Sequence, residues 1–345
     1  MNIVTNKILG KWTEYTISND HGISVSALDF GGIITKIMAP DKNGKLENIV
    51  LGYKDYQDYE SNPHYFGAII GRVAGRIKGA SFELDGRTYN LEANNGENHL
   101  HGGSGGFHQI IWKVFPFKTD SEAGLKLTYK SADGAGGYPG NLDITVIYTL
   151  NNEQLIIDYL ATTDQTTPIS LTNHSYFNLS GNLKNTIHDH RVTIDSSRFV
   201  EFDKDLIPTG KLADVEGTPF DFRSGRILRT GFDHCFEQNL IVGNGYDHYF
   251  LFDHTSEFQA IIEEPDSGRM ISVKTNQPGL VMYTANALEN GLQLTESISR
   301  KHHGVCLETQ GSPASLYNDN FPGILLNAGD RYEKQTIFTF QVLKK

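Results

Sequence analysis

The sequence predicts an all-β protein, a large antiparallel β-sandwich. Its apolar segments are short, many of them alternate apolar with polar residues, and turn residues separate them, which is the pattern of half-buried strands. No apolar stripe of useful length recurs at the helical period. The chain also has 35 glycines and 11 % aromatic residues, which suits many turns between strands. Large all-β sheets often reach this length as one domain, so we expect residues 1–345 to form a single domain.

The first part of the chain predicts two hairpins. Residues 12–17 and 23–28 alternate on either side of residues 19–22, whose Asn, Asp and Gly are turn formers. The second hairpin covers residues 80–91, with Asp85-Gly86 at its turn. Residues 55–60, rich in Tyr and Asp, are expected to form a short helix or irregular structure.

Longer strands are expected through the rest of the chain. They cover residues 110–117, 124–130, 142–150, 154–161, 258–264, 270–275, 280–284 and 336–342. No linker, low-complexity segment or short repeat interrupts them. Strand following strand in this way is typical of an antiparallel sandwich.

Composition excludes several classes of function. The formal net charge is −11 and no dense block of Lys or Arg is present, so neither nucleic acid nor an anionic membrane is an expected partner. No apolar run approaches transmembrane length, and residues 1–12 lack the apolar core of a secretory signal. The two cysteines, Cys235 and Cys306, form no CxxC pair and imply no disulfide framework. We therefore expect a cytoplasmic protein.

Residues 304–310 place one carboxylate inside an apolar strand. Alternate residues of a strand share a face, so Cys306, Glu308 and Gln310 are predicted to point one way. A carboxylate that faces a protein interior is costly unless a partner or a polar cleft receives it. Glu308 is thus either a solvated strand residue or a cleft carboxylate. We favour a cleft in which a histidine lies opposite Glu308.

Residues 168–179 carry a polar row beside an apolar one. His174 shares a predicted face with Thr172, Tyr176 and Asn178, while Leu171, Phe177 and Leu179 lie on the other. A single histidine is most often a structural residue, but a row of this kind opposite a clean apolar row favours a functional face. His174 is the candidate partner of Glu308.

Three further stretches offer polar groups for a ligand. Glycines around Arg72 and Arg76 allow a tight backbone that can hold an arginine near sugar hydroxyls or a carboxylate. His99 and His101 share a face of an extended segment, yet no further metal ligand lies nearby at a recognised spacing, so His101 is expected as a hydrogen-bonding residue and no metal site is predicted. Asp247 lies among aromatic residues, as an acceptor for sugar hydroxyls would.

Taken in order, these motifs resemble those of the aldose 1-epimerase family (galactose mutarotases). Each motif alone is weakly specific, whereas the ordered set covers nearly the whole chain. The set comprises Gly71-Arg72-Val73-Ala74-Gly75-Arg76-Ile77, Leu100-His101-Gly102-Gly103, Gly137-Tyr138-Pro139-Gly140, residues 173–179, Asp247-His248, Gln277-Pro278-Gly279 and Cys306-Leu307-Glu308-Thr309-Gln310.

The resemblance implies a β-sandwich enzyme that interconverts the α and β anomers of aldohexoses, chiefly galactose and glucose, without a cofactor. It implies Glu308 as general base and His174 as general acid. Mutarotation needs one base and one acid, and we expect these two groups on opposite sides of the bound sugar. The resemblance further implies that Arg76, His101, Asp247 and Gln277 bind substrate. Such an enzyme is expected as a monomer or weak dimer. Burial would raise the pKa of Glu308, and a nearby Arg76 would oppose that rise.

One departure and three alternatives accompany this resemblance. Many family members have Asn where this chain has Gly75, so one side-chain contact to the sugar is expected to be missing. The first alternative is a non-catalytic sugar-binding sandwich, and the second is a hexose-6-phosphate 1-epimerase, which would need extra cations at the cleft rim. The third is a glycosidase that pairs Glu308 with Asp247, but the resemblance assigns Asp247 to binding.

Overall fold

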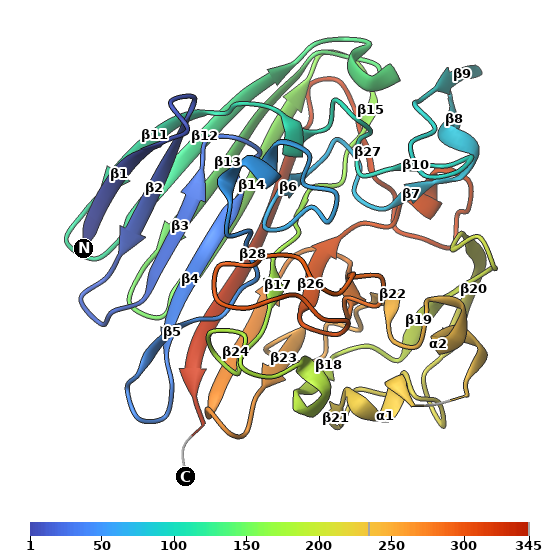
Figure 1. Ribbon diagram of the computed structural model, residues 1–345. Helices are drawn as coiled ribbons and strands as arrows, with labels where there is room; N and C mark the ends of the chain where they lie inside the picture. The colour runs from blue at the N-terminus through green and yellow to red at the C-terminus, as the bar shows by residue number, and fades with distance from the viewer. Residues whose placement is uncertain (234, 344–345) are drawn as a thin grey trace.

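The computed structural model describes residues 1–233 and 235–343. Its largest element is a nine-stranded antiparallel sheet that runs the length of the molecule (Figure 1). In spatial order this sheet contains β11 (Lys113–Lys118), β12 (Ala123–Ser131), β13 (Leu142–Leu150), β14 (Gln154–Thr163), β28 (Arg331–Val342), β24 (Arg269–Thr275), β23 (Ala260–Glu263), β18 (Arg191–Ile194) and β21 (Arg226–Ile227).

Two further sheets pack against this long sheet. The five-stranded sheet, blue in Figure 1, contains β1 (Asn2–Ile8), β2 (Trp12–Ser18), β3 (Ser24–Leu28), β4 (Ile34–Pro40) and β5 (Leu46–Asn48). The six-stranded sheet contains β17 (Tyr176–Phe177), β26 (Val305–Gln310), β25 (Gly279–Tyr283), β22 (Asp247–Leu251), β19 (Arg198–Phe202) and β20 (Pro208–Asp214). The predicted antiparallel sandwich is confirmed.

One apolar cluster connects all three sheets. It includes Val25 of the five-stranded sheet, Val146 and Phe338 of the nine-stranded sheet, and Val305 and Leu307 of the six-stranded sheet. Burial of apolar surface, worth roughly 25 cal/mol per Å², thus holds the layers together. The alternation that predicted each strand is the same alternation that fills this core.

Residues 49–51 join the two smaller sheets edge to edge. Val50 forms an antiparallel bridge with Phe177. The Leu51 N–H donates to the Tyr176 carbonyl at 3.0 Å, and the Asn178 N–H donates to the Ile49 carbonyl at 2.8 Å. These bonds fix the edge of β17, the strand that follows His174.

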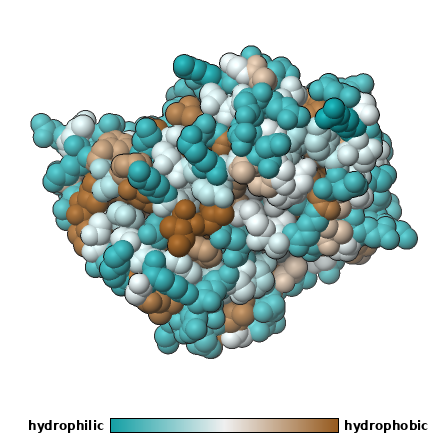
Figure 2. Space-filling view, turned by 90° about the horizontal axis from the view of Figure 1, so that it is seen from above, coloured by the Kyte–Doolittle hydropathy of each residue, from teal (hydrophilic) through white to brown (hydrophobic). Residues whose placement is uncertain are grey.

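Within residues 1–233 and 235–343, helical structure is confined to short segments, as the sequence predicts. The two α-helices are α1 (Arg229–Phe232) and α2 (Glu237–Ile241). Short 3₁₀ turns span Tyr56–Glu60, Lys78–Ala80, Phe107–Gln109, Ala135–Gly137, Ile187–Asp189 and Pro313–Leu316. No helix among the described residues is long and apolar enough to cross a membrane. The face seen from above is hydrophilic over most of its area, with hydrophobic residues in separate patches (Figure 2).

The predicted hairpins are present, and one predicted strand is divided. β2 pairs with β3, and β8 (Ser81–Leu84) pairs with β9 (Arg87–Asn90). Two-stranded pairings also join β7 (Arg76–Ile77) to β10 (His99–Leu100) and β15 (Thr167–Pro168) to β27 (Leu325–Leu326). Residues 168–179 do not form one continuous strand. β16 (Thr172–Asn173) pairs with β6 (Ile69–Ile70), whereas β17 pairs with β26, so the chain changes partner at His174.

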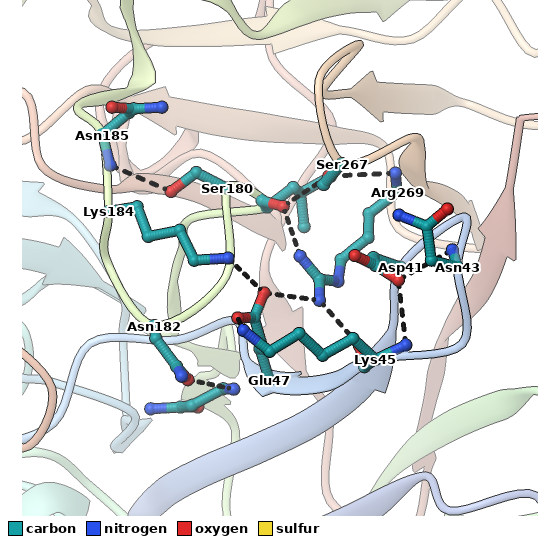
Figure 3. A network of polar contacts seen from close by, with 12 residues as sticks. Asp41, Asn43, Lys45, Glu47, Ser180, Asn182, Lys184, Asn185, Ser267 and Arg269 are labelled. Atoms are coloured by element: carbon teal, nitrogen blue, oxygen red, sulfur yellow. Dashed lines mark hydrogen bonds and ion pairs between the residues drawn. The ribbon is translucent and has the colours of Figure 1, made fainter.

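A buried ion cluster ties the five-stranded sheet to the nine-stranded sheet (Figure 3). Glu47 follows the first residue of β5 and is fully buried. Its Oε2 accepts from Arg269 Nη2 at 3.0 Å and from Lys184 Nζ at 2.6 Å. Lys45 Nζ lies 2.6 Å from Oε1. Arg269 begins β24, so one carboxylate links three separate parts of the chain.

The cluster leaves no room for a side chain at Gly181. A Cβ there would lie 2.3 Å from Glu47 Oε2 and 2.4 Å from Arg269 Nη1, and its φ is +77°. Burial raises the pKa of Glu47, but the hydrogen bonds from Lys184, Lys45 and Arg269 outweigh it and hold that pKa at about 2. Because the folded-state pKa is depressed, this stabilisation is present above the unfolded pKa and is lost as pH falls toward 2.

Glu47→Gln is expected to lower the free energy of unfolding by about 3–5 kcal/mol, because it leaves the buried Arg269 guanidinium without its counter-charge. Urea denaturation measures the change. The control is Asp143→Asn, which removes an exposed pair with Lys130 and is expected to cost no more than about 1 kcal/mol. Equal losses in the two variants would contradict a structural role for the buried cluster.

Candidate active site

A cavity of about 280 Å³ lies on the face of the six-stranded sheet that points away from the core. Its floor comes from β22, β25 and β26. Its walls come from loop residues 63–65 and from residues 75–76, 100–101 and 202–208. All six candidate residues but one line this cavity, namely Arg76, His101, His174, Asp247 and Glu308.

Strand register arranges the floor in rows. Asp247 pairs with Tyr283, and Tyr283 pairs with Cys306. In the next row Val281 pairs with both Tyr249 and Glu308. Directly paired residues of neighbouring strands point to the same face. The same register sends Val305 and Leu307 into the core, so the alternation predicted for residues 304–310 is confirmed.

Glu308 and His174 are in direct contact. Glu308 Oε1 lies 3.4 Å from His174 Nε2, and both side chains are buried. The expectation that the two groups lie on opposite sides of the sugar is therefore wrong. Their adjacency follows from topology, because His174 lies two residues before the start of β17 and β17 pairs with β26.

Burial shifts both members of this pair toward their neutral forms. It raises the pKa of the Glu308 carboxyl well above its ordinary value, the charge of Asp247 adds to that rise, and Arg76 opposes it. Burial also lowers the pKa of His174 to about 3. The direction for Glu308 agrees with the sequence-based expectation.

His101 is held as a hydrogen-bond donor. Its Nδ1 accepts from the Gly75 N–H at 3.1 Å, and burial lowers its pKa well below the ordinary value. A neutral ring whose Nδ1 accepts carries its proton on Nε2. One nitrogen of His101 lies within 4.8 Å of ligand atoms of His174 and Glu308, a donor set that zinc can use. Because Nε2 carries the proton, it can donate a hydrogen bond but has no free lone pair for a metal ion.

Gly75 has a structural reason to lack a side chain. Its φ is +87°, and a Cβ would lie 3.1 Å from the Pro313 ring. What Gly75 supplies to the site is its backbone N–H on His101. His99 takes no part, since its Nδ1 is 2.7 Å from the Glu92 carbonyl and it does not line the cavity. His101 has φ +54°, which breaks the extended backbone that would have placed the two rings on one face.

Arg76 and Asp247 form the polar end of the cavity. Arg76 Nη1 lies 3.9 Å from Asp247 Oδ2, and Arg76 Nε donates to Asn95 Oδ1 at 3.0 Å. Burial raises the pKa of Asp247 to about 6, against the opposing charge of Arg76. Both side chains are only partly buried, so each has donor or acceptor capacity for a ligand's hydroxyl groups.

Aromatic rings enclose the catalytic candidates. The Tyr65 ring lies 4.7 Å from the His101 ring and 5.9 Å from the His174 ring, and the Tyr176 ring lies 5.1 Å from His174. Such faces suit the C–H side of a sugar and exclude water. Tyr176 shares the predicted polar row with His174, so the sequence carried a signal for it. Tyr65 lies in a loop and had none.

Two residues lie elsewhere than the sequence suggested. Gln277 does not line the cavity. Its Nε2 donates to the Leu171 carbonyl at 3.2 Å and to the Tyr332 hydroxyl at 3.4 Å. Arg72, the other arginine considered, is buried and donates to Ser131, Ala132 and Pro139.

The glutamine at the cavity is Gln310. The strand alternation places Gln310 on the same face as Cys306 and Glu308, but no other feature of the sequence marks it as a residue of the site. Its Nε2 donates to the Ala74 carbonyl at 3.3 Å.

Comparison with known proteins finds relatives that match nearly the whole chain. The family model for aldose 1-epimerase matches residues 13–339. A galactose mutarotase from Sus scrofa is 40 % identical over 336 residues, which is 96 % of this chain and 95 % of that one.

Solved structures agree equally well. A galactose 1-epimerase from Lactobacillus acidophilus superposes with a TM-score of 0.87 at 27 % identity, covering 99 % of both chains. A GalM/aldose epimerase homologue from C. elegans gives a TM-score of 0.87 at 29 % identity, covering 99 % of this chain and 100 % of that one. The chain therefore belongs to the aldose 1-epimerase family.

Proposed function

We propose that this aldose 1-epimerase interconverts the α and β anomers of aldohexoses, galactose and glucose foremost, with Glu308 as general base and His174 as general acid. The observation that carries the proposal is the 3.4 Å contact between their side chains in the cavity. The name of the Sus scrofa relative supports galactose as a substrate. We further propose that the chain acts as one domain in the cytoplasm, in keeping with its free Cys235 and Cys306.

The reaction needs an acid and a base close together. Mutarotation removes a proton from the O1 hydroxyl and gives a proton to the ring oxygen O5. Both oxygens are bonded to C1, so two groups in contact can reach them from one side of the sugar. The C1–O5 bond breaks, O1 becomes the aldehyde oxygen, and C1–C2 rotation presents the other face for closure.

One proton held by the pair is sufficient for this cycle. With the proton on His174, ionised Glu308 accepts from O1 while the imidazolium donates to O5. The pair then consists of protonated Glu308 and neutral His174. Ring closure returns both protons in reverse. Burial makes ionised Glu308 a strong base and protonated His174 a strong acid, and positioned groups of this kind contribute on the order of 10²–10⁴-fold each.

The remaining polar groups are proposed to bind and orient the sugar. Asp247 and Arg76 supply an acceptor and donors for hydroxyl groups at one end. The Nε2–H of His101 is proposed to stabilise the developing aldehyde oxygen.

A phosphorylated sugar is the less suitable substrate. Arg76 is the only Arg or Lys among the described residues of the cavity lining, and it already faces Asp247. A phosphate group would require unpaired cations there. Glucose 6-phosphate is therefore expected to compete poorly with galactose, and tight competition would favour the hexose-6-phosphate alternative.

Glu308→Gln and His174→Ala are each expected to lower kcat about 10²–10⁴-fold, because each removes one half of the proton relay. Polarimetry of freshly dissolved α-galactose measures the rate. A sugar-binding assay on the same variants separates catalysis from binding. Full wild-type rates in Glu308→Gln would refute its role as base, and a wild type without mutarotase activity would favour a non-catalytic sugar-binding protein.

The pH dependence of kcat/KM is expected to show an acid limb near pH 6. The pKa of Asp247 is raised to about 6, so the carboxyl becomes protonated as pH falls through that value and accepts fewer hydroxyl hydrogen bonds. Asp247→Asn should lower kcat/KM and abolish this limb. An unchanged limb in Asp247→Asn would assign it to another group.

Gln310→Ala is expected to raise KM for galactose, because Gln310 lines the cavity. Gln277→Ala is the matched control. It should leave KM within about twofold and reduce stability by about 1 kcal/mol through its lost hydrogen bonds. A large KM effect confined to Gln277→Ala would restore Gln277 as a substrate contact.

A further inference from the structure

We propose that Cys306 is a positioning residue whose sulfur accepts the Nδ1–H of His174, so that Nε2 is the nitrogen that exchanges protons with the sugar. The inference rests on the proposed role of His174 and adds a determinant of its tautomer. Cys306 itself is fully buried and does not line the cavity, so it acts through His174 alone.

One strand contacts both nitrogens of the His174 ring. Cys306 Sγ lies 3.5 Å from Nδ1, and Glu308 Oε1 lies 3.4 Å from Nε2. Cys306 and Glu308 are two residues apart on the same face of β26, a separation of roughly 6.6 Å along a strand. The imidazole spans that separation, so β26 sets the ring's orientation at both ends.

Among the described residues, Cys306 is the one side chain that hydrogen-bonds to Nδ1, and the backbone of His174 itself also hydrogen-bonds to its own ring. Aromatic rings occupy the remaining directions, with centroids 5.1 to 6.5 Å from that of His174. The ionisable groups that face His174 are Cys306, Glu308, His101, Tyr65, Tyr176 and Tyr283, with Asp247, His64 and His108 farther away. Tyr176 donates its hydroxyl to the His64 carbonyl, and the Tyr283 hydroxyl accepts from the Ala287 N–H.

A thiol suits this position because it is a weak partner. Sulfur is a weak hydrogen-bond acceptor, so it holds the Nδ1–H tautomer without strongly stabilising the imidazolium. A carboxylate at the same place would keep the proton on His174 and make it a poor acid. Burial raises the pKa of the Cys306 thiol well above its ordinary value. The sulfur therefore carries no negative charge that would stabilise the imidazolium as a carboxylate would.

The test compares Cys306→Ala with Cys306→Ser, and uses Cys235→Ser, at the exposed cysteine, as the matched control. Cys306→Ala should lower kcat about 10–100-fold, the range seen when the partner that orients a metal-ligating histidine is removed. Cys306→Ser should recover most of this loss, because a hydroxyl oxygen accepts the same hydrogen bond. As a better acceptor it should also raise the pKa of His174, so that kcat falls at a higher pH on acidification than in the wild type. Cys235→Ser should change nothing.

Two results would overturn the inference. One is that Cys306→Ala and Cys306→Ser have the same kcat as each other and the pH profile of the wild type. A role of Cys306 in packing alone would give this result. The other comes from ¹⁵N NMR of the wild-type imidazole, which needs no variant: a neutral His174 protonated on Nε2 rather than Nδ1 would exclude sulfur as the acceptor. If His174→Ala retains full activity, the proposed function itself fails. If His174→Ala is inactive and the Cys306 variants are normal, only this inference fails.

Discussion

Burying the Glu308 carboxylate is the constraint on which the site depends. A buried carboxylate without a partner is strongly unfavourable, yet Glu308 lies in a strand whose other face belongs to the apolar core. The charge of Arg76 opposes the resulting rise in the pKa of Glu308, and His174 lies in direct contact with the carboxyl. The pairing of Tyr176 with Cys306 brings His174 to this place, so the hydrogen bonds of β17 with β26 assemble the pair.

The same sheet extends the site outward from Glu308. Pairing of β22, β25 and β26 places Asp247 on the exposed face one row away. Arg76 and His101 come from the short β7–β10 pairing and the turn that follows it. Sheet register thus fixes the proposed acid–base pair and the proposed hydroxyl acceptor, while loops add the arginine, the second histidine and the aromatic rings.

The sequence predicted those features that depend on alternation within one strand. The sandwich, the hairpins, and the outward direction of Glu308 all follow from period-two patterns. Features that depend on pairing between distant strands were beyond it. No local pattern reveals that the chain changes partner at His174, that Glu308 and His174 touch, or that Gln277 turns toward Tyr332 while Gln310 faces the cavity. The order of the motifs identified Arg76 and Asp247 as site residues. Their spacing in the sequence does not predict that they form an ion pair.

In the proposed mechanism, the contacting pair Glu308 and His174 supplies and takes back every proton that one turnover needs. A hydrogen that leaves O1 of one anomer stays on the pair while C1 turns, and it is available to O1 of the other anomer. Bulk solvent then supplies no proton, so no water channel has to reach the reacting atoms. The mouth of the cavity therefore plays no part in delivering protons. Its loops are free to diversify for different sugar substituents while the chemistry beneath them stays unchanged.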